Sequence, residues 1–264
     1  MCRMVGVLSL KPINPSEYLI GAPCSLLTQA EMGFQGDGWG IGYYENKCLR
    51  VFKSFKPVYE EKELFSKVCG SLRTNLFIAH VRKASNPRGL PREKLIGLEN
   101  TQPFRHNNLL FAHNGSIKAL NVVEKLGEYK QLIRGVNDSE IYFVLFLKYW
   151  NLYQPNILKI IRSIEKDLQD SVKEGEKPYS SLNAIFSDGE KLYAVNRYIE
   201  GKNLKSLCYK DSEYFRMVYR YNGSSMVIAS EKLDNKCEWR SLSDGEILIA
   251  EVTKDKIEYR ILRL

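Results

Sequence analysis

The feature that most constrains the fold is a block of helix that separates two blocks of short strands. Residues 141–150 are apolar on almost every side, which is typical of a helix buried by its neighbours, and a second helix is expected over 156–173. Strands bounded by turn residues are expected both before and after this block. Because strands and helices do not alternate one by one, the pattern indicates two packed sheets flanked by helices and not a βαβ series.

Hydrophobic periodicity and turn residues locate the individual elements. Pro23 is expected to kink or split the first helix. The glycine-rich stretch 33–42 lets other backbone come close, and its Gly36-Asp37-Gly38 is interpreted as a hairpin turn that leads into a strand. Helices are expected over 16–32 and 60–69, and strands over 3–10, 48–55, 76–82, 108–115, 182–186, 191–196, 214–221, 226–230, 246–252 and 257–262.

The bulk composition is that of a soluble globular protein. The chain has 264 residues, of which 44% are hydrophobic and 27% are charged. Its net charge of +8 is the one argument for nucleic-acid binding, but the basic residues are scattered and nearly matched by acidic ones, which favours a solvated surface of mixed charge. No apolar run reaches the roughly 18 residues of a membrane span, and the N-terminus lacks the order of a signal peptide. We therefore expect a cytoplasmic protein without membrane or nucleic-acid partners.

The cysteines and histidines show no spacing typical of a metal site. No CxxC or CxxH pair occurs, so we expect no bound metal, and reduced thiols as in other intracellular proteins. No Walker loop is present, and no cofactor is expected. The six cysteines are residues 2, 24, 48, 69, 208 and 237, and the three histidines are residues 80, 106 and 113.

Cys2 opens the first expected strand and offers unusual chemistry. If an aminopeptidase removes Met1, which the small side chain behind it favours, Cys2 carries both a thiol nucleophile and its own free α-amine. The amine has a pKa of roughly 7.7–8, so it can take the proton of a thiol whose pKa is about 8.5. Alone, a cysteine at position two is more often incidental than catalytic.

Two other strands end in polar residues that suit a reaction site. Arg82 lies at the end of one strand, before a long loop rich in Pro, Gly and Arg. Another strand ends in Asn114-Gly115, which in isolation is most often a tight turn. Alternatively, the asparagine amide and the glycine N–H aim two donors at one point and form an oxyanion hole. Because antiparallel strands bring the start of one beside the end of the next, these residues and Cys2 are able to meet at one edge.

The residues before the apolar helix allow two interpretations. In the first, Asn137 or Asp138 is only the N-cap, supported by Glu140 at capping-box spacing from Asn137. In the second, Asn137 is the cap and Asp138 projects its carboxylate into a site.

Taken together, these motifs resemble the class II glutamine amidotransferases, which are N-terminal-nucleophile hydrolases, and in particular their stand-alone type. Each motif alone is a weak signal. Together the motifs occur in the same order as in the family, and they span nearly the whole chain. The resembling segments are Met1-Cys2-Arg3, Gly36-Asp37-Gly38-Trp39-Gly40-Ile41-Gly42, Ala79-His80-Val81-Arg82-Lys83-Ala84-Ser85, Asn100-Thr101-Gln102-Pro103-Phe104, Ala112-His113-Asn114-Gly115, Asn137-Asp138-Ser139-Glu140 and, more weakly, Ala229-Ser230-Glu231-Lys232-Leu233-Asp234.

The resemblance implies a single domain over residues 1–264 with an α+β fold, a four-layer αββα sandwich of two mainly antiparallel sheets. It implies that Cys2 attacks the side-chain amide of glutamine or of another γ-glutamyl compound, with its α-amine shuttling the proton. Asn114 and Gly115 match the oxyanion-hole pair. Arg82 matches the arginine that holds the substrate α-carboxylate, Asp138 the carboxylate that pairs with the α-ammonium, and Ser85 a hydroxyl that assists binding.

One residue departs from the family pattern, and several questions stay open. Gln102 stands where the family usually has histidine, which bears on the packing of that loop and not on the substrate groups. The resemblance allows a glutaminase that serves a synthase partner in trans, or a hydrolase of γ-glutamyl peptides. A catalytically silent regulatory subunit is the alternative from another class, and a retained Met1 would favour it.

Overall fold

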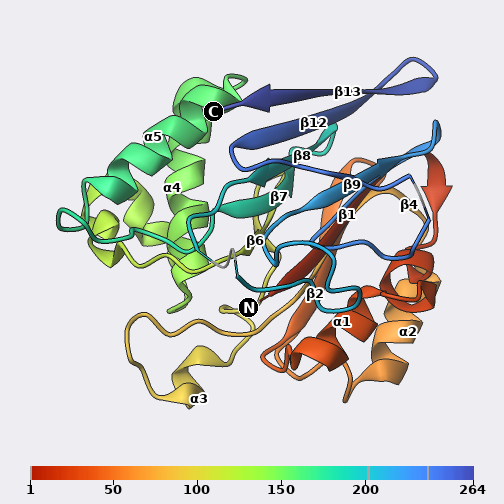
Figure 1. The fold of residues 1–264 in the computed structure, drawn as a ribbon, viewed down its shortest axis with the longest axis horizontal. Coiled ribbons are helices and arrows are strands. Elements are labelled where there is room, and N and C mark those ends of the chain that lie inside the picture. Colours follow the sequence, from red (N-terminus) through yellow and green to blue (C-terminus); the bar gives the residue numbers. More distant parts are fainter. Residues whose placement is uncertain (1, 201–202, 237) are drawn as a thin grey trace.

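Two antiparallel sheets form the centre of the computed structural model, which describes residues 2–200, 203–236 and 238–264 (Figure 1). The first sheet has seven strands and the second has six, within the described residues. In order across the first sheet the strands are β11 (Arg240–Ser241), β9 (Val218–Tyr221), β10 (Ser225–Ala229), β1 (Arg3–Ile13), β4 (Thr74–Val81), β2 (Trp39–Glu45) and β3 (Cys48–Ser54). Across the second they are β13 (Lys256–Arg263), β12 (Glu246–Thr253), β8 (Lys191–Asn196), β7 (Asn183–Ser187), β6 (Leu109–Asn114) and β5 (Phe104–His106).

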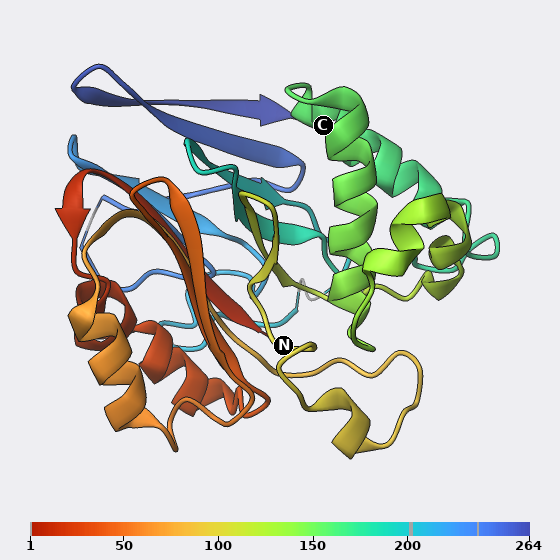
Figure 2. The same cartoon turned by 180° about the vertical axis from the view of Figure 1, so that it is seen from behind.

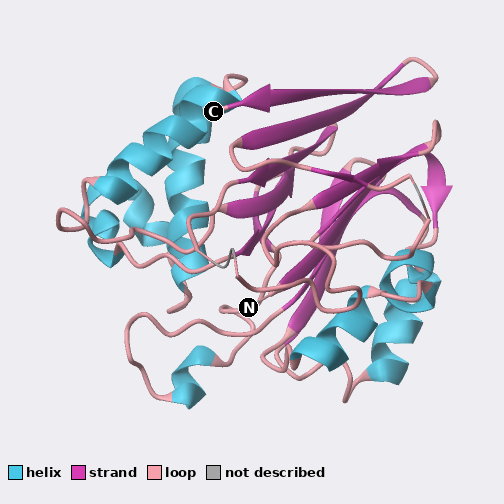
Figure 3. Ribbon diagram, in the orientation of Figure 1, coloured by secondary structure: helices cyan, strands magenta, loops and turns pink. Residues whose placement is uncertain are grey.

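Helices cover the outer face of each sheet, as Figures 1 and 2 show from opposite sides. On the first sheet lie a π-helix (Glu17–Gly21), α1 (Leu26–Gly33) and α2 (Lys62–Ser71). On the second lie α4 (Asp138–Tyr153), α5 (Ile157–Gln169) and a 3-10 helix (Leu120–Leu132), while the short α3 (Arg92–Leu95) lies in the loop after β4. Figure 3 separates these layers by colour. The predicted four-layer αββα arrangement is confirmed.

Three layers of apolar side chains hold the sandwich together. Met4, Ile78 and Ile185 belong to the layer between the sheets, whereas Phe77 on the opposite face of β4 packs toward α1 and α2. The third layer lies between the second sheet and the helices, where the rings of Phe146 and Phe186 are 4.7 Å apart. Period-two alternation therefore distributes each strand's apolar residues over two cores.

The helices follow local rules that the sequence carries. The π-helix and α1 are separated by the segment containing Pro23, as expected, and Ser25 caps α1 by accepting from Thr28 N. The apolar face of α5 repeats at helical spacing, and Asn156 caps this helix by accepting from Lys159 N. The buried residues of this face are Ile157, Ile160, Ile161, Ile164 and Leu168.

The expectation of reduced thiols is wrong for one pair of cysteines. Cys24 and Cys208 form a disulfide across 184 residues, while Cys2, Cys48 and Cys69 are free. Cys237 and the removal of Met1 lie outside the described residues. No spacing rule links residues so far apart in sequence, and the disulfide weakens the redox part of the argument for a cytoplasmic location. Along the described chain, every helix is too short or too polar to cross a bilayer.

The interpretation of the glycine-rich stretch as a hairpin is also wrong. Gly36-Asp37-Gly38 joins α1 to β2, and it is bound to Arg82, the residue after β4, through Asp37 N to Arg82 O (3.0 Å) and Arg82 N to Gly38 O (2.8 Å). The close approach of other backbone is confirmed, because a Cβ on Gly40 would lie 2.5 Å from Gln102 O. This close packing places the glycine-rich segment against two motifs that are distant in sequence.

Candidate active site

The start of β1 lies beside the end of β4. Arg3, the first residue of β1, pairs with Val81, the last residue of β4, so Cys2 comes next to the residues that follow β4. The Cys2 Sγ lies 3.5 Å from both the N and the O of Lys83. The thiol is buried, with 6% of Cys2 exposed.

The guanidinium of Arg82 is bound to the protein through Nη1. Nη1 donates to Leu95 O (2.8 Å) and to Asp37 O (3.3 Å), and the residue is 2% exposed. Within the described residues, Nε and Nη2 make no hydrogen bond, although both are donors. One fork of a planar guanidinium is therefore available to a carboxylate.

Asp138 is the first residue of α4 and points its carboxylate away from the helix. Asn137 is the N-cap and accepts from Ser139 N (3.0 Å). The Asp138 Oδ1 accepts from Ser85 Oγ (2.6 Å), and Oδ2 accepts from Ile117 N (2.7 Å). The hydrogen bond joins Ser85 and Asp138 across 53 residues of sequence.

The capping box expected between Asn137 and Glu140 does not form. The Glu140 carboxylate accepts from Arg134 N (3.0 Å) and Gly135 N (2.8 Å), which lie before the cap. The N–H of Asn137 donates instead to Asn100 Oδ1 (3.1 Å). The start of α4 is thus tied to the Asn100 segment by contacts that residue spacing does not reveal.

Asn114 ends β6 on the second sheet, and Gly115 follows it; β6 packs against β1 and β4 of the first sheet. Asn114 is 1% exposed, and its Oδ1 has no hydrogen-bond partner among the described residues. A Cβ on Gly115 would lie 2.2 Å from Ser181 O. Glycine is therefore required here by the neighbouring backbone.

Gln102 stands where the family usually has histidine, and its side chain binds the backbone of β6. Its Oε1 accepts from His113 N (2.7 Å), and its Nε2 donates to His113 O (3.3 Å). The amide thus pairs with the backbone of β6 as a neighbouring strand would, one residue before Asn114. On the opposite side, the His80 ring of β4 lies 3.2 Å from the same His113 O and joins the two sheets.

Burial sets the electrostatics of the cluster. It raises the pKa of the Cys2 thiol, with Asp138 acting in the same direction and the hydrogen bond to Lys83 and the charge of Arg82 opposing it. Burial lowers the pKa of Arg82, and the negative charges of Cys2, Asp37 and Asp138 oppose that shift. Cys2, Arg82 and Asp138 therefore lie within electrostatic reach of one another.

The two buried histidines near the cluster are neutral. Burial lowers the pKa of His80 to about 3 and also lowers the pKa of His113. The His113 ring is held between Ser139 Oγ (2.8 Å) and Ser181 O (2.9 Å), which assigns the proton to Nε2. Both rings thus join elements together, and neither is placed as a general base.

The residues that fix the start of β1 were not predicted from the sequence. Arg3 is fully buried, donates to Tyr214 O (3.0 Å), stacks on the Tyr214 ring at 3.5 Å and pairs with Glu231 at 3.4 Å. Met4 exchanges hydrogen bonds with Ser230, through its N to Oγ (3.0 Å) and through its O from Ser230 N (3.0 Å). The weak tail motif, which contains Ser230 and Glu231, was the available signal.

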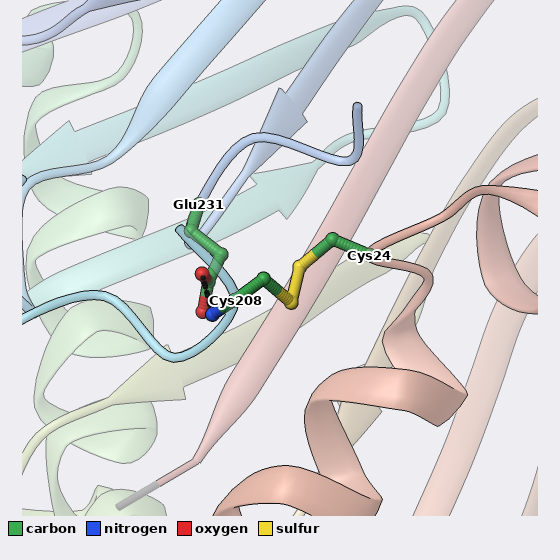
Figure 4. A group of neighbouring side chains, drawn as sticks. All are labelled: Cys24, Cys208 and Glu231. Carbon is green, nitrogen blue, oxygen red and sulfur yellow. Dashed lines mark hydrogen bonds between the residues drawn. A yellow bond between two sulfur atoms is a disulfide. The ribbon is translucent and has the colours of Figure 1, made fainter. Parts of the chain in front are cut away.

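One group of potential metal ligands lies beside this anchor: Cys24, Cys208 and Glu231 (Figure 4). The two sulfurs are joined as a disulfide. The Glu231 carboxylate accepts from Leu207 N (3.0 Å) and Cys208 N (2.9 Å). In this state the group offers no thiolate, and its carboxylate already has partners.

Comparison with known proteins places this site in a family. A family model described as "Glutamine amidotransferases class-II" matches residues 1–255. The uncharacterised protein MJ1515 of Methanocaldococcus jannaschii is 27% identical over 277 residues, covering 94% of this chain and 69% of that protein. The gamma-glutamyl-hercynylcysteine sulfoxide hydrolase of Mycobacterium tuberculosis is 29% identical over 124 residues, covering 44% of this chain and 50% of that enzyme.

A solved structure supports the same fold. A glutamine aminotransferase class-II domain protein, SPO2029 from Silicibacter pomeroyi, superposes with a TM-score of 0.66 and covers 100% of both chains. Its sequence identity is 20%, so this likeness concerns the fold alone.

Proposed function

Because the chain belongs to the class II glutamine amidotransferases, we propose that it hydrolyses the γ-amide of glutamine through Cys2. The Sγ attacks the amide carbon and forms a thioester, and the amide nitrogen takes a proton and leaves as ammonia. Water then attacks the thioester and releases glutamate and the thiol. The reaction needs no resident cofactor, and we propose that it takes place in the cytoplasm.

The thiol needs a base because burial raises its pKa. The α-amine of Cys2, freed when Met1 is removed, is the base in this proposal, since an amine of pKa roughly 8 is matched to proton transfer near neutral pH. Lys83 N lies 3.5 Å from the sulfur and stabilises its anionic form.

The substrate head is recognised by opposite charges. The unused Nε and Nη2 of Arg82 take the α-carboxylate, and the Asp138 carboxylate takes the α-ammonium. Ser85 is already bonded to Asp138 at 2.6 Å, and it orients that carboxylate. A free amino-acid head is therefore selected at this end of the site.

Asn114 and Gly115 serve as the oxyanion donors in this proposal. The amide Nδ2 of Asn114 and the N–H of Gly115 stabilise the charge that develops on the carbonyl oxygen. Loss of one such donor removes about 3–4 kcal/mol of transition-state stabilisation.

The observation that carries the proposal is that one segment contacts two residues that are distant from it in sequence. The residue after Arg82 lies 3.5 Å from the Cys2 Sγ, and Ser85 donates to the Asp138 carboxylate (2.6 Å). The test compares three proteins, each released from a cleavable N-terminal fusion and checked by intact mass. One begins with Cys2, one retains Met1 before Cys2, and one carries Cys2→Ala. Only the first is expected to form glutamate from glutamine, and equal rates in all three would reject the assignment.

A second candidate substrate class is the γ-glutamyl peptides. The Mycobacterium tuberculosis relative is named as a hydrolase of a γ-glutamyl compound, which supports this candidate. Rates on glutamine and on γ-glutamyl dipeptides separate the two, because a peptide substrate releases an amine, whereas glutamine releases ammonia that a synthase partner in trans could use. A Cys2-first protein that is inactive on every γ-glutamyl compound would instead be a regulatory subunit.

A further inference from the structure

A cavity of about 650 Å³ lies apart from the candidate active site. It opens where both sheets present an edge strand, since β3 ends the first sheet and β5 ends the second. Helix α4 and the segment 98–103 complete its walls. None of the six candidate site residues lines it, so it is not the glutamine pocket.

Apolar side chains form one part of the cavity wall. Phe104 comes from β5, and Phe143, Val144 and Leu147 come from consecutive turns of α4. All four are buried, yet they face a space large enough for a small organic molecule.

Basic side chains line the mouth of the cavity. Lys53, Arg105 and Arg134 outnumber the two acids, Glu99 and Glu140. Glu140 is already bound by two backbone N–H groups, from Arg134 and Gly135. The lining therefore carries one more positive than negative charge.

The three cations have no carboxylate within ion-pair distance in the part of the chain that the structure describes, although Glu140 acts electrostatically on both Lys53 and Arg134. None of them belongs to an ion pair there, and the hydrogen bond of Lys53 Nζ goes to Thr101 O (2.8 Å). Lys53 is half-buried, which makes its unpaired charge costly. Burial lowers the pKa of Lys53, and the nearby Glu140 and Glu99 oppose this shift.

We propose that this cavity binds an amphipathic organic anion, with the apolar body against α4 and β5 and the anionic head at Lys53, Arg105 and Arg134. The site is separate from the hydrolytic centre and does not depend on its activity.

Two short paths along the chain connect the cavity lining to the candidate active site. Lys53 binds Thr101 O, and the next residue, Gln102, pairs with the backbone of His113 beside Asn114. Glu140 lies two residues after Asp138 in α4. An anion bound at the proposed head-group position would therefore lie close to the segments that support Asn114 and Asp138.

The test titrates the Cys2→Ala protein with 8-anilinonaphthalene-1-sulfonate, an amphipathic anion that fluoresces in apolar sites, and with the uncharged N-phenyl-1-naphthylamine. Use of Cys2→Ala makes the result independent of catalysis. We expect one saturable sulfonate site. Arg105→Gln with Arg134→Gln is expected to raise its Kd about tenfold, because charge-assisted hydrogen bonds are lost, and to change the Kd of the neutral dye less than twofold.

Two further variants fix the location. Val144→Phe, which fills the cavity, is expected to remove both dyes, with the fold checked by circular dichroism. Arg162→Gln, on the exposed face of α5, is the matched control and is expected to leave both unchanged. Sulfonate binding that persists in Val144→Phe, that ignores the double arginine variant, or that has no single saturable site would overturn the proposal.

Discussion

Replacing Cys208 with serine is expected to lower the free energy of unfolding substantially, because the disulfide with Cys24 closes a loop of 184 residues. For a loop of that length, the chain-entropy relation gives about 5 kcal/mol at 25 °C. Residual structure in the denatured chain reduces the gain, so a loss of about 3–5 kcal/mol is expected. The effect arises in the unfolded chain and not from any single contact.

Guanidinium chloride unfolding, followed by circular dichroism, measures this loss. With an m value of about 6 kcal/mol/M, a loss of about 4 kcal/mol moves the midpoint by about 0.7 M. Cys48→Ser is the matched control, since Cys48 is exposed and free, and its midpoint should not move. Dithiothreitol should bring the wild type to the midpoint of Cys208→Ser and leave that variant unchanged.

Two results would refute this reasoning. A wild-type midpoint that does not respond to dithiothreitol would mean that no disulfide forms in solution. An equal response in wild type and Cys208→Ser would assign the effect to another thiol.

The remaining predictions concern the site and its supports. Asn114→Ala should lower kcat by about 10²–10³ with little change in KM, measured by glutamate release, since the donor acts on the transition state. Glu231→Gln should cost about 3–5 kcal/mol in denaturant unfolding, because it leaves Arg3 buried without its anionic partner. The pKa of His80 is about 3 in the folded chain and about 6.5 in the unfolded chain. Below pH 6.5 the unfolded chain therefore binds a proton that the folded chain does not, and the free energy of unfolding falls as the pH drops. Urea unfolding between pH 6 and 4.5 should show His80→Gln with a slope shallower by about 1.4 kcal/mol per pH unit.

The sheets were predictable because their signal is local. Alternation along β4 placed Phe77 and Ile78 in different cores, and the antiparallel rule brought Cys2 beside the end of β4, as the register shows. The meeting of the start of β1 with the end of β4 could therefore be predicted from the sequence alone.

What the sequence did not reveal depends on pairs that are remote along the chain. The partners Cys24 and Cys208, like Arg3 and Glu231, have no spacing rule, and each alone looks like an ordinary residue. The capping box at Glu140 was wrong for a related reason. The spacing between Asn137 and Glu140 fits the capping-box rule, but the Glu140 carboxylate accepts from two backbone N–H groups that precede the cap.

The exchange of histidine for Gln102 shows what that position requires in this chain. The N–H and the C=O of His113 each need a hydrogen-bond partner. The carboxamide of Gln102 offers one acceptor and one donor side by side, so it binds both groups. Because Thr101, the residue before it, binds Lys53 in the cavity wall, the amide stands between the proposed anion site and Asn114. A substitution here is therefore expected to alter the support of Asn114, the proposed oxyanion donor, and to leave Arg82 and Asp138, which we propose to bind the substrate head, as they are.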